Sequence, residues 1–450
     1  MAEGEGGASA PTPAGAAALG WTAHPGAALA GAMRVPGDKS ISHRAVMLAA
    51  LADGRSRIEG FLEGEDTRAT AAIFAAMGVA IESPSPSCRI VHGVGIDGLR
   101  PPAGALDCGN SGTAMRLLAG LLAGQAFDSV LIGDASLSKR PMLRVMAPLR
   151  AMGAGIDSDD GERPPLRIRG GASLRGIAFD SPVASAQVKS ALLLAGLYAG
   201  GWTTVVEPRP TRDYTERMLA AFGWPVEYAP GRARLAGGHR LRARDIDVPA
   251  DFSSAAFFVV AATLVPGSSL LLRSVGVDPR RTGLLEALRM MGADIRELDR
   301  REGICGPVAD LAVRHAPLRG IDLPERLVAD MIDEFPVFAV AAALAEGRTR
   351  IRGAAELRVK ESDRIRAMAE GLRALGARLE EREDGMELEG GALGGGRVDS
   401  RGDHRIAMAF AVAAQRAGGE IVIDDVANVA TSFPGFEPLA RSAGFGLRQD

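Results

Sequence analysis

The stretch AVMLAALADGRSRIEGF, residues 45–61, joins an Ala/Leu-rich run to a β-prone run through a turn glycine, Gly54. The apolar run predicts a helix, and the run after the glycine predicts a strand. The same pattern returns five times, as AMRLLAGLLAGQAFDSVLIGD (114–134), ALLLAGLYAGGWTTVVEP (191–208), FFVVAATLVPGSSLLLRSV (257–275), FAVAAALAEGRTRIRGA (338–354) and AMAFAVAAQRAGGEIVIDDV (407–426). Because the turn glycines lie 66 to 80 residues apart, we interpret the chain as six repeated units.

A second amphipathic run follows each copy and ends at a glycine. Glycine suits the position after a helix because it takes the left-handed conformation without strain, and the six are Gly78, Gly153, Gly223, Gly292, Gly376 and Gly444. Each unit is therefore helix, strand, helix, strand, with further short strands, which predicts an α/β fold with helices packed on sheets. Two three-unit domains are the simplest arrangement, with the boundary in the Arg/Gly-rich stretch 230–248.

Composition excludes several classes of protein. The 52 Lys and Arg and 55 Asp and Glu leave a net charge of -3, which disfavours nucleic acid as the main partner. Three dispersed cysteines and six scattered histidines indicate neither a disulfide framework nor a metal site. No apolar run approaches the roughly 18 residues of a membrane span. The Ala/Gly/Pro-rich residues 1–28 predict a disordered tail, and a soluble, reducing compartment fits the whole chain.

Small and polar residues precede the first helix of every unit. The segments are GDKSISHR (37–44), CGNSGT (108–113), SAQVKS (185–190), DFSS (251–254), DMIDE (330–334) and GDHR (402–405). For units two and four taken alone, helix capping explains them best. If the units are equivalent, however, several helix starts converge on one cleft, and their free N–H groups favour anions.

Basic residues near the other helix starts support such a cleft. Only four of the 52 basic residues are lysines, and all four lie in helix-start segments: Lys39, Lys139, Lys189 and Lys360. Arg140, Arg212 and Arg364 lie near the starts of second helices, where a cation opposes the helix dipole. These residues predict a cleft between two domains, lined with Lys and Arg, that binds a multiply anionic small molecule.

Six strings closely resemble the EPSP synthase family, the 3-phosphoshikimate 1-carboxyvinyltransferases. They are PGDKSISHRA (36–45), GNSGTAMR (109–116), GDASLSKRPM (133–142), SAQVKSALLLAG (185–196), RVKESDRI (358–365) and DHRIAM (403–408). ATSFP (430–434) and SAQVKSA resemble the class II branch. The other branch has a lysine in the segment of Ser432, so phosphate contacts from that point are not expected here.

The resemblance implies two domains, each of three βαβαββ units, in the six-fold enolpyruvyl transferase arrangement. One domain is expected at residues 37–249, and the other at 29–36 plus 250–450. The family often has Gly-Asp where this chain has VPAD (248–251), which implies a small change of hinge backbone and none of chemistry. The family is usually monomeric and cytoplasmic, and its reaction needs no metal or organic cofactor.

The family reaction transfers the enolpyruvyl group of phosphoenolpyruvate to the 5-hydroxyl of shikimate 3-phosphate and releases phosphate. Matching positions imply that Asp333 is the base and Glu361 the proton donor, and that Lys39 contacts both substrates. Shikimate 3-phosphate would be held by Lys39, Ser40, Arg44, Ser185, Gln187, Arg212, Asp333 and Lys360. Phosphoenolpyruvate would be held by Lys39, Gly112, Arg140, Gln187, Arg364 and Arg405. Glyphosate, the family's inhibitor, occupies the phosphoenolpyruvate site, and tolerant class II members have Ala at the position of Gly112.

Three alternatives remain open at this point. On residue pattern alone, Asp333 and Glu361 are better explained as a helix cap and a surface salt-bridge partner. The sister enzyme that uses UDP-N-acetylglucosamine shares the fold, but it typically has Lys-Asn at Lys39-Ser40 and a cysteine in the loop that is DASLSK (134–139) here. A non-catalytic repeat protein that binds phosphorylated ligands is the third alternative.

Overall fold

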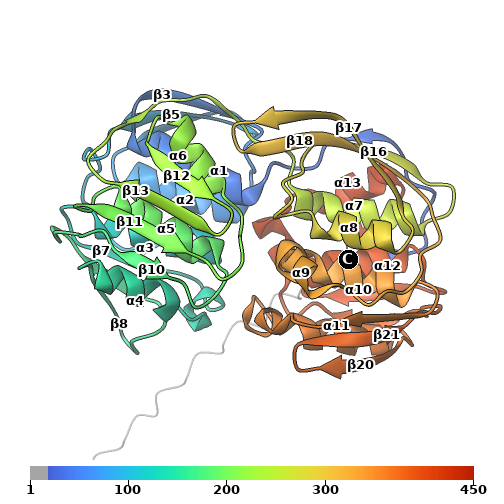
Figure 1. Ribbon diagram of the computed structural model, residues 1–450. Helices are drawn as coiled ribbons and strands as arrows, with labels where there is room; N and C mark the ends of the chain where they lie inside the picture. Colours follow the sequence, from blue (N-terminus) through green and yellow to red (C-terminus); the bar gives the residue numbers. More distant parts are fainter. Residues whose placement is uncertain (1–18, 450) are drawn as a thin grey trace, which may run out of the picture.

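The computed structural model describes residues 19–449. The described chain forms two lobes that lie side by side (Figure 1). One hydrophobic core spans Ile41 to Val248, and we call this part lobe 1; the other joins residues between Trp21 and Val35 to residues from Ala250 onward, and we call it lobe 2. The two-domain prediction places its boundaries at these crossings, and the independence of each lobe as a domain stays a prediction.

Lobe 1 contains three successive units. Unit one is α1 (Lys39–Leu51), β3 (Ala52–Glu59), α2 (Glu65–Ala76), β4 (Ala80–Ser85) and β5 (Cys88–Val94). Unit two is β6 (Leu106–Asp107), α3 (Gly112–Ala123), β7 (Ser129–Ile132), η1 (Leu137–Lys139), α4 (Leu143–Ala151), β8 (Gly155–Ser158) and β9 (Leu166–Arg169). Unit three is β10 (Ala178–Asp180), α5 (Ala186–Gly196), β11 (Trp202–Val206), α6 (Tyr214–Ala221), β12 (Val226–Ala229) and β13 (Arg232–Ala236), followed by β14 (Leu241–Arg242) and β15 (Ile246–Asp247).

Lobe 2 repeats this order. Unit four is β2 (Ala30–Met33), α7 (Phe252–Leu264), β16 (Ser269–Gly276), α8 (Gly283–Met290), β17 (Asp294–Gly303) and β18 (Gly306–Arg314). Unit five is α9 (Glu325–Val328), η2 (Ala329–Glu334), α10 (Phe335–Ala343), β19 (Arg348–Ile351), η3 (Ala355–Val359), α11 (Arg364–Ala374), β20 (Arg378–Arg382) and β21 (Gly385–Glu389). Unit six is β22 (Gly396–Asp399), α12 (His404–Ala414), β23 (Ile421–Asp424), η4 (Ala427–Thr431), α13 (Phe436–Ala443) and β24 (Gly446–Gln449), completed by β1 (Trp21–His24).

Each unit has a small sheet, which β14 and β15 complete in unit one, and the strand orders match between units. Unit two has the order β6-β7-β9-β8 and unit six has β22-β23-β1-β24. The first strand runs parallel to the second and the others pair antiparallel, which is the βαβαββ arrangement. In unit five the first strand is reduced to isolated bridges at Arg319 and Asp322. The predicted α/β class with six βαβαββ units is confirmed.

The predicted disordered tail, residues 1–28, is wrong over the part that the structure describes. β1 pairs with both β23 and β24 and supplies the strand that unit six otherwise lacks. Trp21 is 3% exposed, and its ring stacks on Phe436 with centroids 5.3 Å apart. The Ala/Gly/Pro-rich composition around β1 predicted disorder, but the segment contains Trp21, a large aromatic side chain that packs in the core of lobe 2. Residues 1–18 lie outside the described residues.

The first and second helices of the units occupy different layers. The first helices α3, α5, α7, α10 and α12 are buried over almost their whole length, as expected for helices that are apolar all round. The second helices lie outside them and keep one exposed face (Figure 1). All six glycines predicted to end the second helices have positive φ, from 86° at Gly223 to 115° at Gly444, so this prediction is confirmed.

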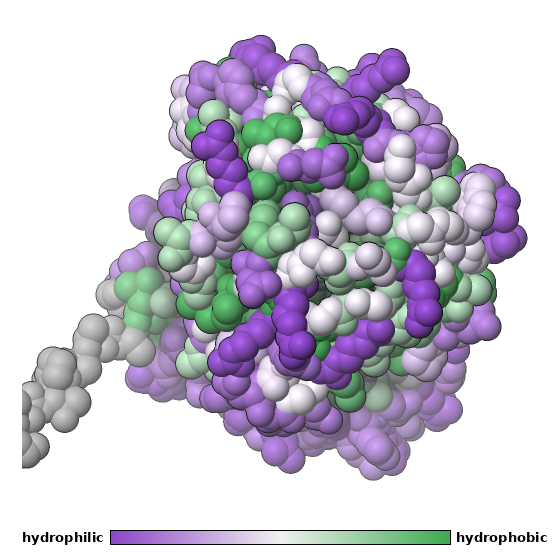
Figure 2. Space-filling model, turned by 90° about the vertical axis from the view of Figure 1, so that its left-hand side faces the viewer, coloured by the Kyte–Doolittle hydropathy of each residue, from purple (hydrophilic) through white to green (hydrophobic). Residues whose placement is uncertain are grey.

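The hairpin β17–β18 extends from lobe 2 toward lobe 1 along one edge of the molecule (Figure 1). Its tip residue Cys305 is buried among the core residues of lobe 1. The other face of lobe 1, away from lobe 2, intersperses apolar side chains with hydrophilic ones (Figure 2). In the range 19–449, no helix is long and apolar enough to cross a membrane.

Candidate active site

A cavity of about 410 Å³ lies between the two lobes. It contains every residue that the motifs assigned to a site: Lys39, Ser40, Arg44, Gly112, Arg140, Ser185, Gln187, Arg212, Asp333, Lys360, Glu361, Arg364 and Arg405. These residues come from five of the six units, so the convergence of helix starts on one cleft is present in the structure. The role of each residue stays a prediction.

Caps hold several of these helix starts in place. Asp38 accepts from the N–H of Ile41 at 2.9 Å, and Ser185 accepts from Val188 at 3.4 Å. Ser111 and Asp251, in units two and four, accept from Ala114 at 3.1 Å and Ser253 at 2.7 Å. The capping role favoured for those two units is therefore present, and Asp251 also lines the cavity.

Lys39 contacts both lobes at the start of α1. Its Nζ donates to Asp66 Oδ2 at 3.1 Å in lobe 1 and to Ser432 Oγ at 2.7 Å in lobe 2. The segment that lacks the lysine of the other branch thus holds the ammonium of Lys39 through a hydroxyl. A compact ammonium fits between these two acceptors, whereas a planar guanidinium has a different shape and reach.

The residues predicted to hold shikimate 3-phosphate lie mainly on lobe 1. Arg44 is bonded within its own lobe: it donates to Thr215 Oγ1 at 2.7 Å, to Ser190 Oγ at 2.9 Å and to the carbonyl of Ser40 at 2.9 Å. Burial lowers the pKa of its guanidinium to about 10, so the group is still cationic at neutral pH. Arg212 reaches across the cleft, and its Nη2 donates to Asp333 Oδ2 at 3.1 Å.

Two of the arginines predicted to hold phosphoenolpyruvate, Arg140 and Arg364, contact Glu361. Arg140 Nη1 lies 3.5 Å from Glu361 Oε1, across the cleft, and Arg364 Nη2 donates to Glu361 Oε2 at 2.7 Å. Arg364 is itself fixed by Asp403, which accepts from its Nε at 2.7 Å. Arg405 Nη1 donates to the backbone carbonyl of Asp333 at 3.0 Å. Arg364 thus contacts both candidate carboxylates, because its Nη1 also lies 3.7 Å from Asp333 Oδ1.

Both candidate carboxylates are ionised by their surroundings. Burial alone would raise the pKa of Asp333, but Lys360, Arg405, Arg212 and Arg281 outweigh it and hold that pKa well below its usual range. Burial likewise opposes ionisation of Glu361, yet Arg364 and Arg140 hold its pKa well below the ordinary value. A base and an acid need pKa values pushed apart, and the protein's own charges do not separate these two.

Motif matching missed several groups that line the cavity. They are Asp66, Arg116, Arg144, Arg281, Glu356 and His404, among others. Arg116 and His404 stand inside the matched strings, and Arg281 precedes the second helix of unit four as Arg212 precedes that of unit three. Equivalence between the units could therefore have found Arg281. Burial and the charge of Lys39 lower the pKa of His404 to about 3, so its imidazole is neutral.

Two of the four lysines line the cavity, so the idea that retained lysines mark the cleft is half wrong. Lys39 and Lys360 line the cavity. Lys189 is buried instead, with its Nζ 2.8 Å from Glu207 Oε2 and 2.9 Å from Glu216 Oε1. Lys139 ends the short helix η1 outside the cavity lining. An ammonium was retained at Lys189 because it fits between two buried carboxylates.

The sequence profile described as "EPSP synthase (3-phosphoshikimate 1-carboxyvinyltransferase)" matches residues 23–439. The chain belongs to the EPSP synthase family. The 3-phosphoshikimate 1-carboxyvinyltransferase of Xanthomonas oryzae pv. oryzae is 67% identical over 427 residues, which cover 95% of this chain and 97% of that protein. The enzyme of Xanthomonas axonopodis pv. citri shows the same identity over the same length.

Solved structures agree with this family assignment. The EPSP synthase of Acinetobacter baumannii superposes with a TM-score of 0.87 at 50% identity and covers 96% of this chain and 100% of its own. The enolpyruvyl transferase NikO of Streptomyces tendae gives a TM-score of 0.77 at 19% identity over 97% of this chain and 99% of its own. The second likeness shows the shared fold alone, which the EPSP synthase family has in common with another enolpyruvyl transferase.

Proposed function

We propose that this chain transfers the enolpyruvyl group of phosphoenolpyruvate to the 5-hydroxyl of shikimate 3-phosphate, with release of phosphate. The observation that carries the proposal is the convergence of all thirteen motif residues on one cavity between the lobes. The lining has twelve Lys and Arg against six Asp and Glu. Such an excess of cations suits two substrates that together carry roughly five to six negative charges.

The chemistry needs a base and an acid within the same cavity. Asp333 takes the proton of the 5-hydroxyl while the hydroxyl oxygen bonds to C2 of phosphoenolpyruvate. Glu361 gives a proton to C3, and a tetrahedral intermediate results. That intermediate then loses phosphate from C2 and a proton from C3, which restores the double bond. Both carboxylates lie in one cavity, where Asp333 contacts Arg212 and Lys360 and Glu361 contacts Arg140 and Arg364, and the division of roles between them follows the matched family positions.

The charges of the substrates can supply the difference between the pKa values of Asp333 and Glu361 that the protein's own charges do not supply. The phosphate and carboxylate of phosphoenolpyruvate carry negative charge to Arg140 and Arg364, the two cations that most lower the pKa of Glu361, and the phosphate of shikimate 3-phosphate carries negative charge to Lys360, which lowers it as well. Once those charges are neutralised, burial is left to raise the pKa of Glu361. Glu361 then holds a proton in the complex and can donate it to C3.

We also propose that the enzyme acts in the cytoplasm as a monomer. Support for the monomer is that both walls of the cavity come from one chain, so no second copy is needed to complete it. The cytoplasmic assignment rests on the soluble family and on three cysteines that are all buried and free. Sedimentation of the purified chain over a range of concentrations tests the first assignment.

Release of inorganic phosphate tests the function. With shikimate 3-phosphate and phosphoenolpyruvate together, phosphate should appear at an enzymatic rate, and neither substrate alone should release it. Release with UDP-N-acetylglucosamine in place of shikimate 3-phosphate would support the sister activity. Binding of shikimate 3-phosphate without any release would leave the non-catalytic, phospholigand-binding alternative.

A further inference from the structure

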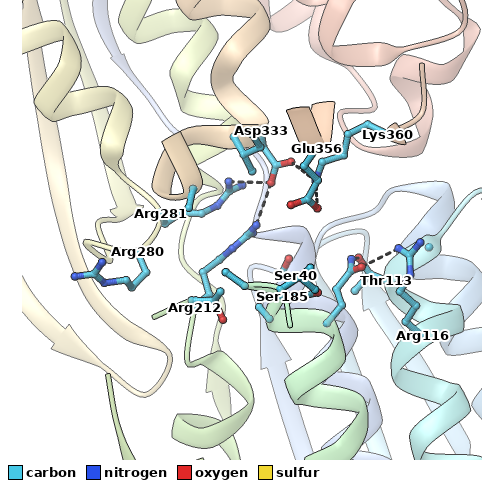
Figure 3. A pocket seen from close by; sticks show the side chains of 18 of the residues that line it. Ser40, Thr113, Arg116, Ser185, Arg212, Arg280, Arg281, Asp333, Glu356 and Lys360 are labelled. Atoms are coloured by element: carbon cyan, nitrogen blue, oxygen red, sulfur yellow. Dashed lines mark hydrogen bonds and ion pairs between the residues drawn. The ribbon is translucent and has the colours of Figure 1, made fainter. Parts of the chain in front are cut away.

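Asp333 lies among five cations, and one of them differs from the rest. Its carboxylate is 3.1 Å from Arg212, 3.7 Å from Lys360 and 3.7 Å from Arg364, and its carbonyl accepts from Arg405. The family motifs assign these four cations to the two substrates. The fifth is Arg281, whose Nη1 is 3.4 Å from Asp333 Oδ2, and no motif assigns it a ligand. Figure 3 shows Arg281 and Arg212 approaching Asp333 together.

Protein groups hold the guanidinium of Arg281 on both of its terminal nitrogens. Nη1 donates to Glu334 Oε1 at 3.0 Å, and Nη2 donates to Asp251 Oδ1 at 3.3 Å and to Ser253 Oγ. The residue is 5% exposed, and Glu334 is 2% exposed. The burial of Arg281 opposes its charge, but Glu334, Asp251 and Asp333 raise its pKa well above the usual value. The guanidinium of Arg281 therefore stays paired with protein carboxylates whether or not anions enter the cavity.

Arg281 differs in its contacts from the equivalent cations of the other units. The cations before the second helices of units two, three and five are Arg140, Arg212 and Lys360, and each lines the cavity within reach of a candidate carboxylate and a predicted ligand. Arg281 holds the same place before α8 in unit four. Its terminal nitrogens, however, are used by carboxylates and a hydroxyl of its own lobe. Unit four thus supplies a fixed cation where its counterparts supply ligand contacts.

The anchor of Arg281 is also the place where the chain crosses between lobes. Asp251 directly follows the second crossing and caps α7 through the N–H of Ser253. Its other oxygen, Oδ2, accepts from the backbone N–H of Lys39 at 3.4 Å, which is the first residue of α1. Through Asp251, Arg281 therefore connects the candidate base Asp333 to the segment that crosses between the lobes and to α1, the helix that carries Lys39.

We propose that Arg281 is a positioning residue that fixes the place and the ionised state of the Asp333 carboxylate throughout the reaction. The inference rests on the proposed function, because it concerns the group assigned as base. When the phosphate of shikimate 3-phosphate neutralises Arg212 and Lys360, and phosphoenolpyruvate neutralises Arg364 and Arg405, Arg281 is the cation that remains for Asp333. Glu334 and Asp251 are the buried carboxylates that compete with Asp333 for it.

The sign of the pH effect follows from this arrangement. A base works in its ionised form, so activity is present above the pKa of Asp333 and is lost as the pH falls through it. Arg281 lowers that pKa, together with Lys360, Arg405 and Arg212. Weakening its contact should move the acidic limb of the rate profile to higher pH, and an opposite charge at this range shifts a carboxyl pKa by about one unit or more.

The experiment is a double-mutant cycle on turnover, with Arg281→Lys, Asp333→Asn and the double variant. Lysine keeps the charge but cannot reach Asp333, Glu334 and Asp251 with two nitrogens at once. We expect Arg281→Lys to lower kcat by about tenfold or more in the parent, in the range of interacting residues, and to have almost no effect when Asp333 is already Asn. The KM for shikimate 3-phosphate should change little.

Further variants separate positioning from folding. Arg281→Gln removes the charge and should show the larger upward shift of the acidic limb, measured on protein whose thermal unfolding is still cooperative. Arg289→Lys, in the following helix with its ion pair to Glu297 at the surface, is the matched control and should leave kcat unchanged. Equal losses from Arg281→Lys with and without Asp333, or full activity of Arg281→Lys, overturn the inference. Absence of phosphate release by the parent chain would instead reject the proposed function.

Discussion

The two walls of the cavity differ sharply in charge. The wall from lobe 1 has one carboxylate, Asp66, beside seven cations: Lys39, Arg44, Arg116, Arg140, Arg144, Arg209 and Arg212. The wall from lobe 2 has five cations and five carboxylates: Arg280, Arg281, Lys360, Arg364 and Arg405 against Asp251, Asp330, Asp333, Glu356 and Glu361. One wall is thus nearly uniform in charge, and the other alternates.

This difference separates binding from chemistry. Among the described residues, the lobe 1 cations of the cavity other than Lys39 have no ion pair with a carboxylate of their own lobe. They gain most from incoming phosphates and carboxylates, because the ligand supplies the missing opposite charge. On lobe 2 the cations already contact carboxylates, so Lys360, Arg364 and Arg405, which are predicted to bind substrates, also set where those carboxylates lie and whether they are ionised. Substitutions on the two walls should therefore change different kinetic constants.

The largest effect is expected from the carboxylates of lobe 2. Asp333→Asn removes the proposed base and Glu361→Gln removes the proposed proton donor, while each keeps the size of the side chain. General acid–base groups contribute about 10²–10⁴-fold to rate, so kcat should fall by that amount in each variant. Phosphate release measures kcat, and calorimetry with shikimate 3-phosphate should show binding that is largely retained.

A surface carboxylate of the same lobe is the control for this prediction. Asp322→Asn breaks an exposed ion pair with Arg350 and should leave turnover near that of the parent. Near-normal turnover in both Asp333→Asn and Glu361→Gln would remove the assignment of chemistry to lobe 2.

A buried lysine of lobe 1 provides the second test, because it binds carboxylates of its own lobe and lines no part of the cavity. Lys189→Met leaves Glu207 and Glu216 buried without a cation, and breaking such a pair costs about 3–5 kcal/mol of unfolding free energy. Chemical denaturation should show that loss. The KM values at a temperature where the variant is folded should change less than those of a variant at Lys39.

Adding Glu207→Gln and Glu216→Gln to Lys189→Met should recover part of the lost stability, since no buried charge is then unpaired. A large rise in either KM for Lys189→Met, without loss of stability, would show that this ammonium serves the substrates after all.

Part of the fold could be predicted from the sequence alone. The period of the apolar runs and the glycines that end the second helices predicted six α/β units, because those features are local. The completion of unit six by β1 was not predictable in this way, since it depends on a space left open between β23 and β24. Composition around Trp21 pointed to the opposite conclusion.

For the site, the strings collected thirteen residues that all line one cavity, but they could not predict the contacts between residues of different strings. Lys39 and Lys189 both lie in helix-start segments. Only the packing shows that Lys39 faces the cavity, whereas Lys189 contacts two buried glutamates. Arg281 has no distinctive string around it, and its place beside Asp333 comes from the approach of α8 to η2. Charges set by such long-range contacts are invisible in a local pattern.

The shared ammonium of Lys39 gives the third prediction. Lys39→Arg should reduce kcat/KM for both substrates by about 10²-fold, as misplacement by about 1 Å does in other sites. The physical reason is that Nζ fits between Asp66 and Ser432 on opposite lobes, where a longer planar group displaces one of them. Arg55→Lys, an exposed exchange outside the motifs, is the control, and equal small effects in both would contradict the argument.

The smallest effect is expected at Gly112, which lies on the lobe 1 wall of the cavity and is predicted to hold phosphoenolpyruvate. A Cβ at this position would lie 2.9 Å from Arg116 Nη1 and 3.3 Å from Arg140 Nη1. Both neighbours are the ends of flexible side chains, so Gly112→Ala should fold, at the cost of moving two guanidinium groups. Overpacking of this kind costs about 1–3 kcal/mol, and we expect the inhibition constant of glyphosate to rise about tenfold. The KM for phosphoenolpyruvate should rise less, because the substrate is shorter than the inhibitor and leaves the arginines more room. Gly104→Ala, where a Cβ meets nothing within 4 Å, should change neither constant. If the inhibition constant of glyphosate and the KM for phosphoenolpyruvate rise equally in Gly112→Ala, the methyl group acts by displacing Arg140 from both ligands. The explanation that it crowds only the inhibitor would then be wrong.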